Sequence, residues 1–202
     1  MPLITKCKSY LFADDTTLLL SHNNTAQLEL NLNLELEKIQ NWMKGSKLTI
    51  NYTKTKFILF SKIFLLISPT NLSCGVIPIE QVESIKYPGV VIDSRLIWEL
   101  HIDHVGKNVV CGNAELYKLQ PYVNVDLLRK LDFSIVYCHL YYAILFLGAA
   151  NKTLLDFLVK LNNRAVRNVC KIHTNEEISI KYMHLSTYIL EINNIYKYEL
   201  GK

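Results

Sequence analysis

Up to residue 97, short apolar runs alternate with polar turns, a pattern typical of β-strands, and one longer segment has helical periodicity. Apolar runs on both sides of Asp14 and Asp15 predict a hairpin whose tip carries the two carboxylates. The segment over about 25–44 predicts a helix with an asparagine-rich start and Gly45 as its stop. Its predicted buried stripe comprises Leu32, Leu36, Ile39 and Met43.

Further short apolar runs in this part of the chain predict strands. A turn over 52–56 joins the first two of them, and residues 68–75 have the composition of a loop. The predicted strands cover 48–51, 57–60, 76–79 and 85–93.

After residue 97 nearly the whole sequence has helical periodicity. Pro121 separates the first two helices, residues 148–152 separate the second from the third, and Thr174 with Glu177 resembles a capping box. The predicted helices cover 98–119, 125–147, 153–171 and 174–200. The pattern therefore predicts an α+β fold, with an incomplete antiparallel sheet and a packed helix followed by an all-helical region.

One stretch, residues 133–151, contains no Asp, Glu, Lys or Arg and approaches the length of a membrane span. It also contains Ser134, His139 and several tyrosines, and it continues a helical pattern that begins in a polar region. We therefore expect residues 127–147 to form a buried helix of a bundle, with a membrane-associated helix as the alternative.

The composition narrows the class of protein. Half of the residues are hydrophobic and the net charge is only +4, which excludes a disordered chain. The five cysteines contain no Cys-x-x-Cys pair, so a structural zinc site is not expected. Free thiols and the lack of an apolar signal peptide in the first residues predict an intracellular protein, in the cytoplasm or the nucleus.

Asp14 and Asp15 are the first candidate for chemistry. Adjacent carboxylates repel one another, and a divalent cation relieves that conflict. Hard carboxylate oxygens suit Mg²⁺, which takes one or two carboxylates together with substrate phosphates. The alternative is an ordinary turn, since Asp is a favoured turn residue.

A second candidate is a row of cations near the end of the third predicted helix. Their spacing of i, i+4, i+7 and i+11 places them on one face, which could follow a phosphate backbone. The alternative is the solvated surface of a bundle helix. The row comprises Lys160, Arg164, Arg167 and Lys171.

Several short motifs resemble, in their order and spacing, the reverse transcriptases of non-LTR retrotransposons. Residues 12–15, Phe-Ala-Asp-Asp, resemble the family's [Tyr/Phe]-Ala-Asp-Asp motif, and residues 48–55 look like its Leu-x-x-Asn-x-x-Lys-Thr strand and turn. Residues 87–93, Tyr-Pro-Gly-Val-Val-Ile-Asp, look like the hairpin that grips the primer, and Trp98-x-x-His101 follows as in the family. The resemblance covers roughly residues 9–171.

The resemblance implies an RNA-directed DNA polymerase, a nucleotidyltransferase encoded by a transposable element. Residues 1–97 would be a partial palm and residues 98–202 a thumb-like and C-terminal helical region. Asp14 and Asp15 would be catalytic residues that hold Mg²⁺ against the incoming deoxynucleoside triphosphate. Lys54 would be the acid that protonates pyrophosphate, although it is equally compatible with an ordinary turn lysine.

The same resemblance assigns the nucleic-acid contacts. Tyr87, Gly89 and Val90 would belong to the primer grip, where Pro88 replaces the usual Leu and removes a backbone N–H. The basic row on the third predicted helix would position the duplex of RNA template and DNA primer without reading its bases. No membrane partner is expected.

The family's first catalytic Asp lies upstream of the hairpin, and the sequence contains no counterpart of that region. We therefore expect a fragment, the palm and thumb portion with the N-terminal part missing, that is inactive alone. Whether it acts as an enzyme is left open. The alternatives are a nucleic-acid-binding remnant without catalysis and a membrane-associated helical protein.

Overall fold

The structure is a computed structural model that divides the chain into two compact units. The first unit comprises Met1–Pro88 with Asp93–Arg95, and the second, which we call the helical unit, comprises Gly89–Ile92 with Leu96–Lys202. Short strand pairs and one helix build the first unit, and helices build most of the second, so the predicted α+β class is confirmed. The residues that the structure describes are 6–61, 71–142, 144–148, 150–172 and 178–202.

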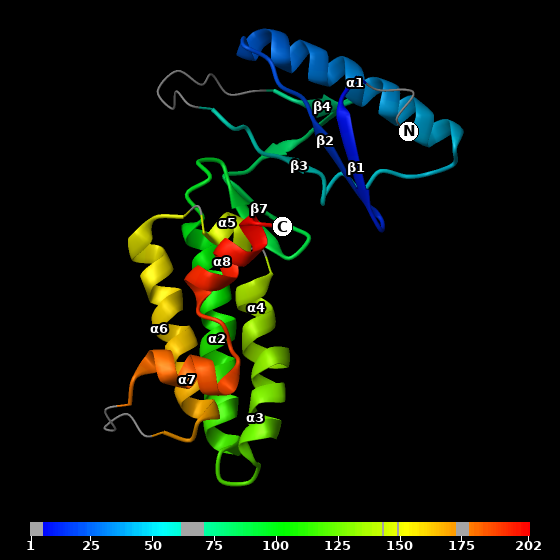
Figure 1. Ribbon diagram of the computed structural model, residues 1–202. Helices are drawn as coiled ribbons and strands as arrows, with labels where there is room; N and C mark the ends of the chain where they lie inside the picture. The colour runs from blue at the N-terminus through cyan, green and yellow to red at the C-terminus, as the bar shows by residue number, and fades with distance from the viewer. Residues whose placement is uncertain (1–5, 62–70, 143, 149, 173–177) are drawn as a thin grey trace. The chain divides into compact units, whose positions relative to one another are not determined.

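The N-terminal hairpin forms as the sequence predicts. Strands β1 (Lys8–Phe12) and β2 (Asp15–Leu19) pair in antiparallel register, with Phe12 opposite Asp15 (Figure 1). A two-residue turn, Ala13–Asp14, joins them. Asp14 therefore lies in the turn and Asp15 begins the second strand, which confirms the predicted position of the carboxylates.

Helix α1 (Thr25–Gly45) begins where it was predicted. The Asn24 side chain caps it by accepting hydrogen bonds from the amides of Ala26 and Gln27, at 2.9 and 3.2 Å. The helix ends at Gly45, the predicted stop, and the left-handed residue after it is Lys47, with φ 56°. Within the predicted stripe only Ile39 is buried, and its three other residues are half-buried.

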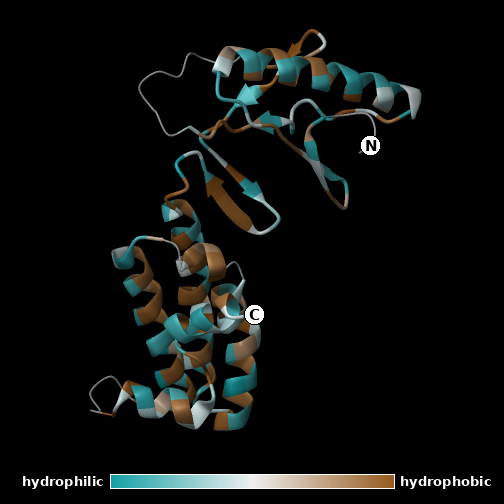
Figure 2. Ribbon diagram, turned by 45° about the horizontal axis from the view of Figure 1, so that its top comes forward, coloured by the Kyte–Doolittle hydropathy of each residue, from teal (hydrophilic) through white to brown (hydrophobic). Residues whose placement is uncertain are grey.

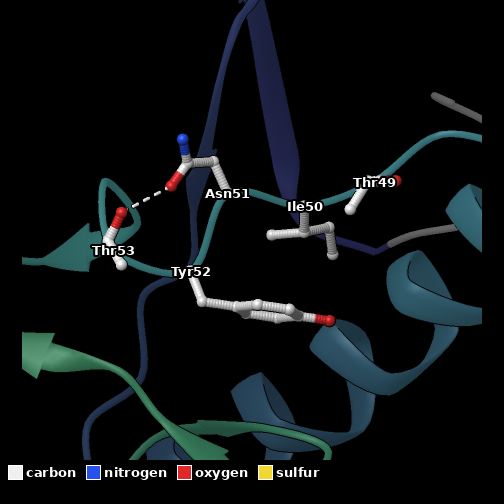
Figure 3. A pocket seen from close by; sticks show the side chains of 5 residues that line it. All are labelled: Thr49, Ile50, Asn51, Tyr52 and Thr53. Atoms are coloured by element: carbon white, nitrogen blue, oxygen red, sulfur yellow. Dashed lines mark hydrogen bonds between the residues drawn. The ribbon is translucent and has the colours of Figure 1, made fainter.

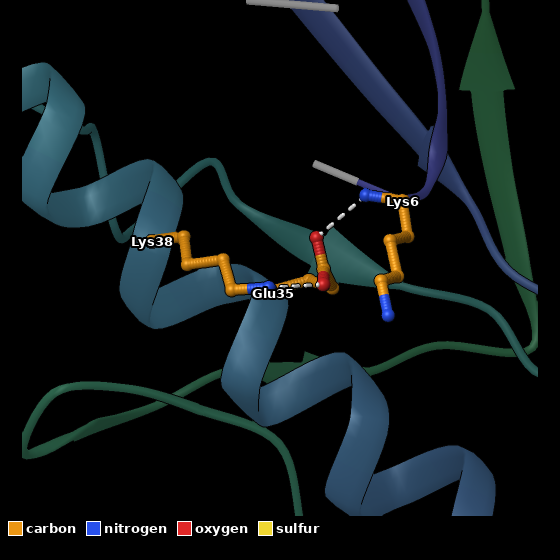
Figure 4. Close-up of polar contacts among 3 residues, drawn as sticks. All are labelled: Lys6, Glu35 and Lys38. Carbon is orange, nitrogen blue, oxygen red and sulfur yellow. Dashed lines mark hydrogen bonds and ion pairs between the residues drawn. The ribbon is translucent and has the colours of Figure 1, made fainter. Parts of the chain in front are cut away.

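A buried carboxylate ties α1 to the start of β1. Glu35 is 5% exposed and accepts a hydrogen bond from the backbone amide of Lys6 at 2.8 Å. Its other oxygen accepts from Lys38 Nζ at 2.7 Å, one turn further along the helix (Figure 4). Because a buried charge without partners is costly, these bonds help to keep Glu35 inside.

The remaining strands are shorter than predicted. They form separate two-stranded pairs, β4 with β5, β7 with β8, and β3 with β6, and the β3–β6 pair is parallel. Among the described residues the predicted incomplete antiparallel sheet takes the form of separate two-stranded pairs, and residues 48–51, predicted as a strand, are not one. Part of the predicted 68–75 loop lies outside the described residues. The strands are β3 (Lys56–Phe57), β4 (Ser73–Cys74), β5 (Ile77–Pro78), β6 (Glu80–Gln81), β7 (Ser84–Tyr87) and β8 (Val90–Asp93).

In the helical unit, α2 packs between α6 on one side and the α3–α4 segment on the other (Figure 1). Hydrophobic stretches alternate with polar ones along these helices (Figure 2), and the apolar positions form one continuous core. The elements are α2 (Glu99–Leu119), α3 (Val125–Asp132), the π-helical turn η2 (Phe133–Tyr137), α4 (Cys138–Tyr141), α5 (Ile144–Leu147), α6 (Lys152–Val169), α7 (Ile180–Thr187) and α8 (Ile192–Leu200).

Two predicted helices are interrupted. The segment 125–147 contains the π turn and then breaks at Tyr142, whose ψ of 127° is extended. The segment predicted as one helix over 174–200 contains α7 and α8, separated after Tyr188, which has a left-handed φ of 56°. The predicted capping box of Thr174 and Glu177 lies outside the described residues.

The apolar segment is packed inside the bundle, as predicted. Leu128, Val136 and Leu140 are fully buried, and α2 reaches the π turn through Gly112. A Cβ at Gly112 would lie 2.8 Å from the carbonyl oxygen of Ile135, so only glycine allows this approach. None of the described helices combines the length and apolar character that crossing a membrane requires.

A polar network fixes the register of α2 against α6. Asn168 Nδ2 donates to the backbone oxygen of Asn113 at 3.0 Å, and Asn113 Nδ2 donates to the backbone oxygen of Leu161 at 3.1 Å. Gln120 Nε2 donates to the backbone oxygen of Asn168 at 2.9 Å. Sliding either helix would leave these buried amides unpaired, so the network selects one packing.

Candidate functional site

The tip of the β1–β2 hairpin holds a strained residue. Ala13 occupies the first corner of the turn with a φ of 50°, a conformation that favours glycine. Such strain persists only where the surrounding structure or function requires it, and it is common at active sites. It places Asp14 and Asp15 next to one another at an exposed tip.

Two exposed carboxylates at one tip are a suitable donor set for Mg²⁺, which prefers oxygen ligands. They can supply two ligand groups. No cluster of three or more His, Cys, Asp or Glu side chains suited to a metal ion occurs among the described residues. The pair is therefore a partial site that substrate phosphates or another carboxylate would have to complete.

Lys54 lies in a turn organised by Asn51. The Asn51 side-chain oxygen accepts from Thr53 Oγ1 at 2.7 Å and from the Lys54 amide at 3.3 Å (Figure 3). Its backbone oxygen accepts from the amide and the hydroxyl of Thr55, at 3.0 and 2.9 Å. The Asn and Thr of the predicted motif thus build the turn themselves, and they leave the Lys54 side chain exposed.

Residues 49–53 also line a shallow hollow beside this turn. The side chain of Tyr52 extends towards α1, where its hydroxyl accepts a hydrogen bond from Gln40 Nε2 at 3.2 Å (Figure 3). The turn is therefore anchored to the helix of the first unit. Within the described part of the chain, no hydrogen bond or ion pair joins Lys54 to Asp14 or Asp15, so its catalytic role stays a prediction.

The grip-like residues lie at the turn between β7 and β8. Tyr87 ends β7, Pro88 and Gly89 form the turn, and Val90 begins β8. Gly89 has a φ of 79°, which together with the preceding proline is typical of a type II turn. Pro88 therefore stands at a corner, where its missing N–H costs no hydrogen bond between the strands.

The turn also has a steric reason for glycine. A Cβ at Gly89 would lie 2.8 Å from Cε1 of the Tyr142 ring. Tyr142 stands at the break between α4 and α5, so the aromatic ring and the turn pack directly on each other. The boundary between the two units passes through this hairpin, and Gly89–Ile92 belong to the helical unit.

The basic row is only partly helical. Lys160 and Arg164 are exposed on α6 and Arg167 is half-buried, while the opposite side of the helix buries Leu158 and Ala165. The helix ends at Val169, so the predicted end at residue 171 is wrong, and Lys171 follows it with a left-handed φ of 56°.

The exposed cations of this row form no ion pairs with the acids that the structure describes. Among the residues that the structure describes, no ion pair involves Lys160, Arg164 or Lys171. By contrast, Lys107 and Lys130 pair with acids one turn away on their own helices, at 2.6 and 3.0 Å. The charges of Lys160, Arg164 and Lys171 are therefore available for an external anion.

Comparison with known proteins agrees with the sequence motifs. Residues 2–92 match a family model described as reverse transcriptase (RNA-dependent DNA polymerase). The matched range contains the Asp14–Asp15 tip, the Lys54 turn and the turn at Gly89. No curated protein and no solved structure gives a significant match. The resemblance to reverse transcriptases is thus supported for this part of the chain.

Proposed function

We propose that the chain is the palm and thumb portion of an RNA-directed DNA polymerase of the non-LTR retrotransposon type. The observation that carries this proposal is the Asp14–Asp15 pair, exposed on a strained turn inside the range that matches the reverse transcriptase family. An ordinary β-turn without a functional role would not need an alanine with a positive φ followed by two acidic residues.

In this function Asp14 and Asp15 would hold Mg²⁺ through their carboxylate oxygens. The chemistry that Mg²⁺ would supply there is a lower pKa of the primer 3′-hydroxyl and partial neutralisation of the triphosphate charge. Lys54, carried on the rigid Asn51 turn, donates a proton to the departing pyrophosphate. The Asn51 turn orients Lys54 through its backbone and leaves the ammonium group exposed for that transfer.

The duplex of template and primer is the partner of the basic row. Lys160, Arg164, Arg167 and Lys171 would neutralise about three phosphates, which gives a slope of log affinity against log salt of roughly −3. These contacts position the duplex and carry no base readout. A nucleic-acid-binding remnant without catalysis is the second candidate, favoured by the exposed cations Lys160, Arg164 and Lys171, which form no ion pair among the described residues.

We further propose that the isolated chain does not extend a primer. Two-metal catalysis needs carboxylates that converge from more than one strand, and the described residues place two adjacent carboxylates at this tip. Primer extension with Mg²⁺ tests this directly, with a complete reverse transcriptase as positive control. Extension that disappears in Asp14→Asn would contradict inactivity, and extension that survives in Asp14→Asn would contradict the catalytic assignment.

Metal binding can be tested without activity. Mn²⁺, which takes the same oxygen ligands, broadens NMR signals of nearby amides. We expect millimolar Mn²⁺ to broaden the amides around Asp14 and Asp15 before those around Asp126, an exposed acid on α3 that pairs with Lys130. The effect should be lost in Asp14→Asn with Asp15→Asn. Equal broadening at Asp126 would show that the tip has no preference for the cation.

A further inference from the structure

Gly89 and the first three residues of β8 belong to the helical unit, and each of the four residues Gly89–Ile92 contacts its helices. Gly89 packs against the Tyr142 ring. Val90 and Ile92 pack against the hydrophobic core of the helices. The remaining residue, Val91, is held by its backbone.

The Val91 amide donates a hydrogen bond to Nδ1 of His101, at 3.4 Å. His101 lies near the start of α2 and is 1% exposed. Because Nδ1 accepts this bond, the ring carries its proton on Nε2. Burial, with a smaller effect from His104, lowers the pKa of His101, which keeps the ring neutral and the Nδ1 lone pair available.

The chain leading into α2 is bent to bring His101 into this position. Leu96 and Trp98 both have left-handed backbone conformations, with φ of 56° and 67°. The Trp98 side chain is buried, and its ring lies 5.2 Å from that of Phe146 on α5. Two left-handed residues within three positions are costly, so packing must hold them in place.

These observations share one consequence. We propose that His101 and Tyr142 are positioning residues that hold Gly89–Ile92 as an arm of the helical unit, so that the turn at Gly89 meets the primer strand in a fixed orientation. The proposal rests on the polymerase function proposed above. In this proposal both residues of the Trp-x-x-His motif have a structural role: Trp98 packs to hold the bend before α2, and His101 holds strand β8 through its hydrogen bond to Val91.

Substitutions at His101 distinguish the effect of its hydrogen bond to Val91 from the effect of its side-chain packing. His101→Leu fills a similar volume but cannot accept a hydrogen bond, whereas His101→Asn places an acceptor oxygen close to the position of Nδ1. His104→Leu makes the same change three residues further along α2, at a half-buried position. The full chain is used for all variants.

The first readout is hydrogen exchange of the Val91 amide in the free chain, followed by NMR. His101→Leu should accelerate it about five- to tenfold, the value of one hydrogen bond. His101→Asn should restore most of the protection, and His104→Leu should leave it unchanged. Exchange at Val91 that is the same in His101→Leu and in the wild type would overturn the anchoring.

The second readout repeats the measurement with a saturating primer–template duplex. Amides of Gly89–Ile92 should gain protection in the wild type and gain several-fold less in His101→Leu. A duplex that binds but leaves these amides unchanged would overturn the role in primer positioning while the proposed function stands. A wild-type chain that binds no duplex would overturn both, and exchange in the free chain would still decide the anchoring.

Discussion

Asp132 is the last residue of α3 and immediately precedes the π turn. It is 1% exposed, and neither of its carboxylate oxygens has a hydrogen-bond partner among the described groups. Burial raises its pKa from 3.8 to about 7. The folded helical unit therefore binds a proton at Asp132 over a pH range in which the unfolded chain releases it.

The direction of the effect follows from linkage. Because the pKa is raised in the folded state, protonated Asp132 makes its full contribution to the free energy of unfolding below about pH 4. That contribution is lost as the pH rises to about 7. At about 1.4 kcal/mol per pH unit, the difference between 3.8 and about 7 corresponds to about 4 kcal/mol. Asp132→Asn removes the titration, so it should stabilise the helical unit by about 3–4 kcal/mol at pH 8.5 and by less than about 1 kcal/mol at pH 4.5.

Urea unfolding across this pH range measures the effect. The chain has two tryptophans, and Trp42→Phe leaves Trp98 as a fluorescent probe of the helical unit. Asp126→Asn is the matched control, because Asp126 is exposed on the same helix and its ion pair is worth little. A difference between Asp132→Asn and the wild type that stays constant with pH would refute the reasoning.

Three further substitutions test the geometry. Ala13→Gly should relieve the left-handed turn, stabilise the hairpin by about 0.5–1 kcal/mol and slow exchange of its amides, whereas Ala26→Gly, in helix α1, should destabilise by a similar amount. Gly89→Ala should disorder the grip-like turn in NMR spectra, and adding Tyr142→Ala should restore part of the native signals, because the ring clash is removed while the φ strain remains. Gly112→Ala should lower the free energy of unfolding by about 1–3 kcal/mol in urea titrations, since its Cβ meets a backbone carbonyl of the π turn that cannot move freely; an unchanged midpoint would contradict the tight approach.

Local features of the fold follow from the sequence because their causes are local. The Asp14–Asp15 hairpin needs only two apolar runs and a two-residue turn. The start of α1 needs only the Asn24 cap. The turn at Lys54 is set by Asn51, two threonines and their hydrogen bonds. In each case the interactions span a few residues, and the sequence pattern contains all of them.

Features that depend on distant contacts do not follow from the pattern. The apolar segment 125–147 has an uninterrupted helical period, yet it contains a π turn that is accommodated by Gly112 on another helix. At the break between α4 and α5, the Tyr142 ring packs against Gly89, a residue far away in the sequence. The parallel pairing of β3 with β6 likewise joins residues from separate parts of the first unit.

The candidate site shows the same division. Its acids, turn lysine and glycine were identified from short motifs. The positioning role proposed for His101 and Tyr142 does not follow from the sequence pattern, although the Trp98-x-x-His101 spacing is visible in it. No sequence motif predicts that Glu35 and Asp132 are buried. The only sequence signal at Asp132 is a charge at the edge of a long uncharged stretch.

In the function proposed above, the basic row binds a template–primer duplex. The most direct test measures affinity across a salt series for the wild type, for Arg164→Ala with Arg167→Ala, and for Lys107→Ala with Lys130→Ala. The last variant removes equal charge from lysines that already pair with acids. We expect a slope of log affinity against log salt of roughly −3 for the wild type and the control, and roughly −1 for the arginine variant. Equal slopes in all three proteins, or binding that is insensitive to salt, would contradict it.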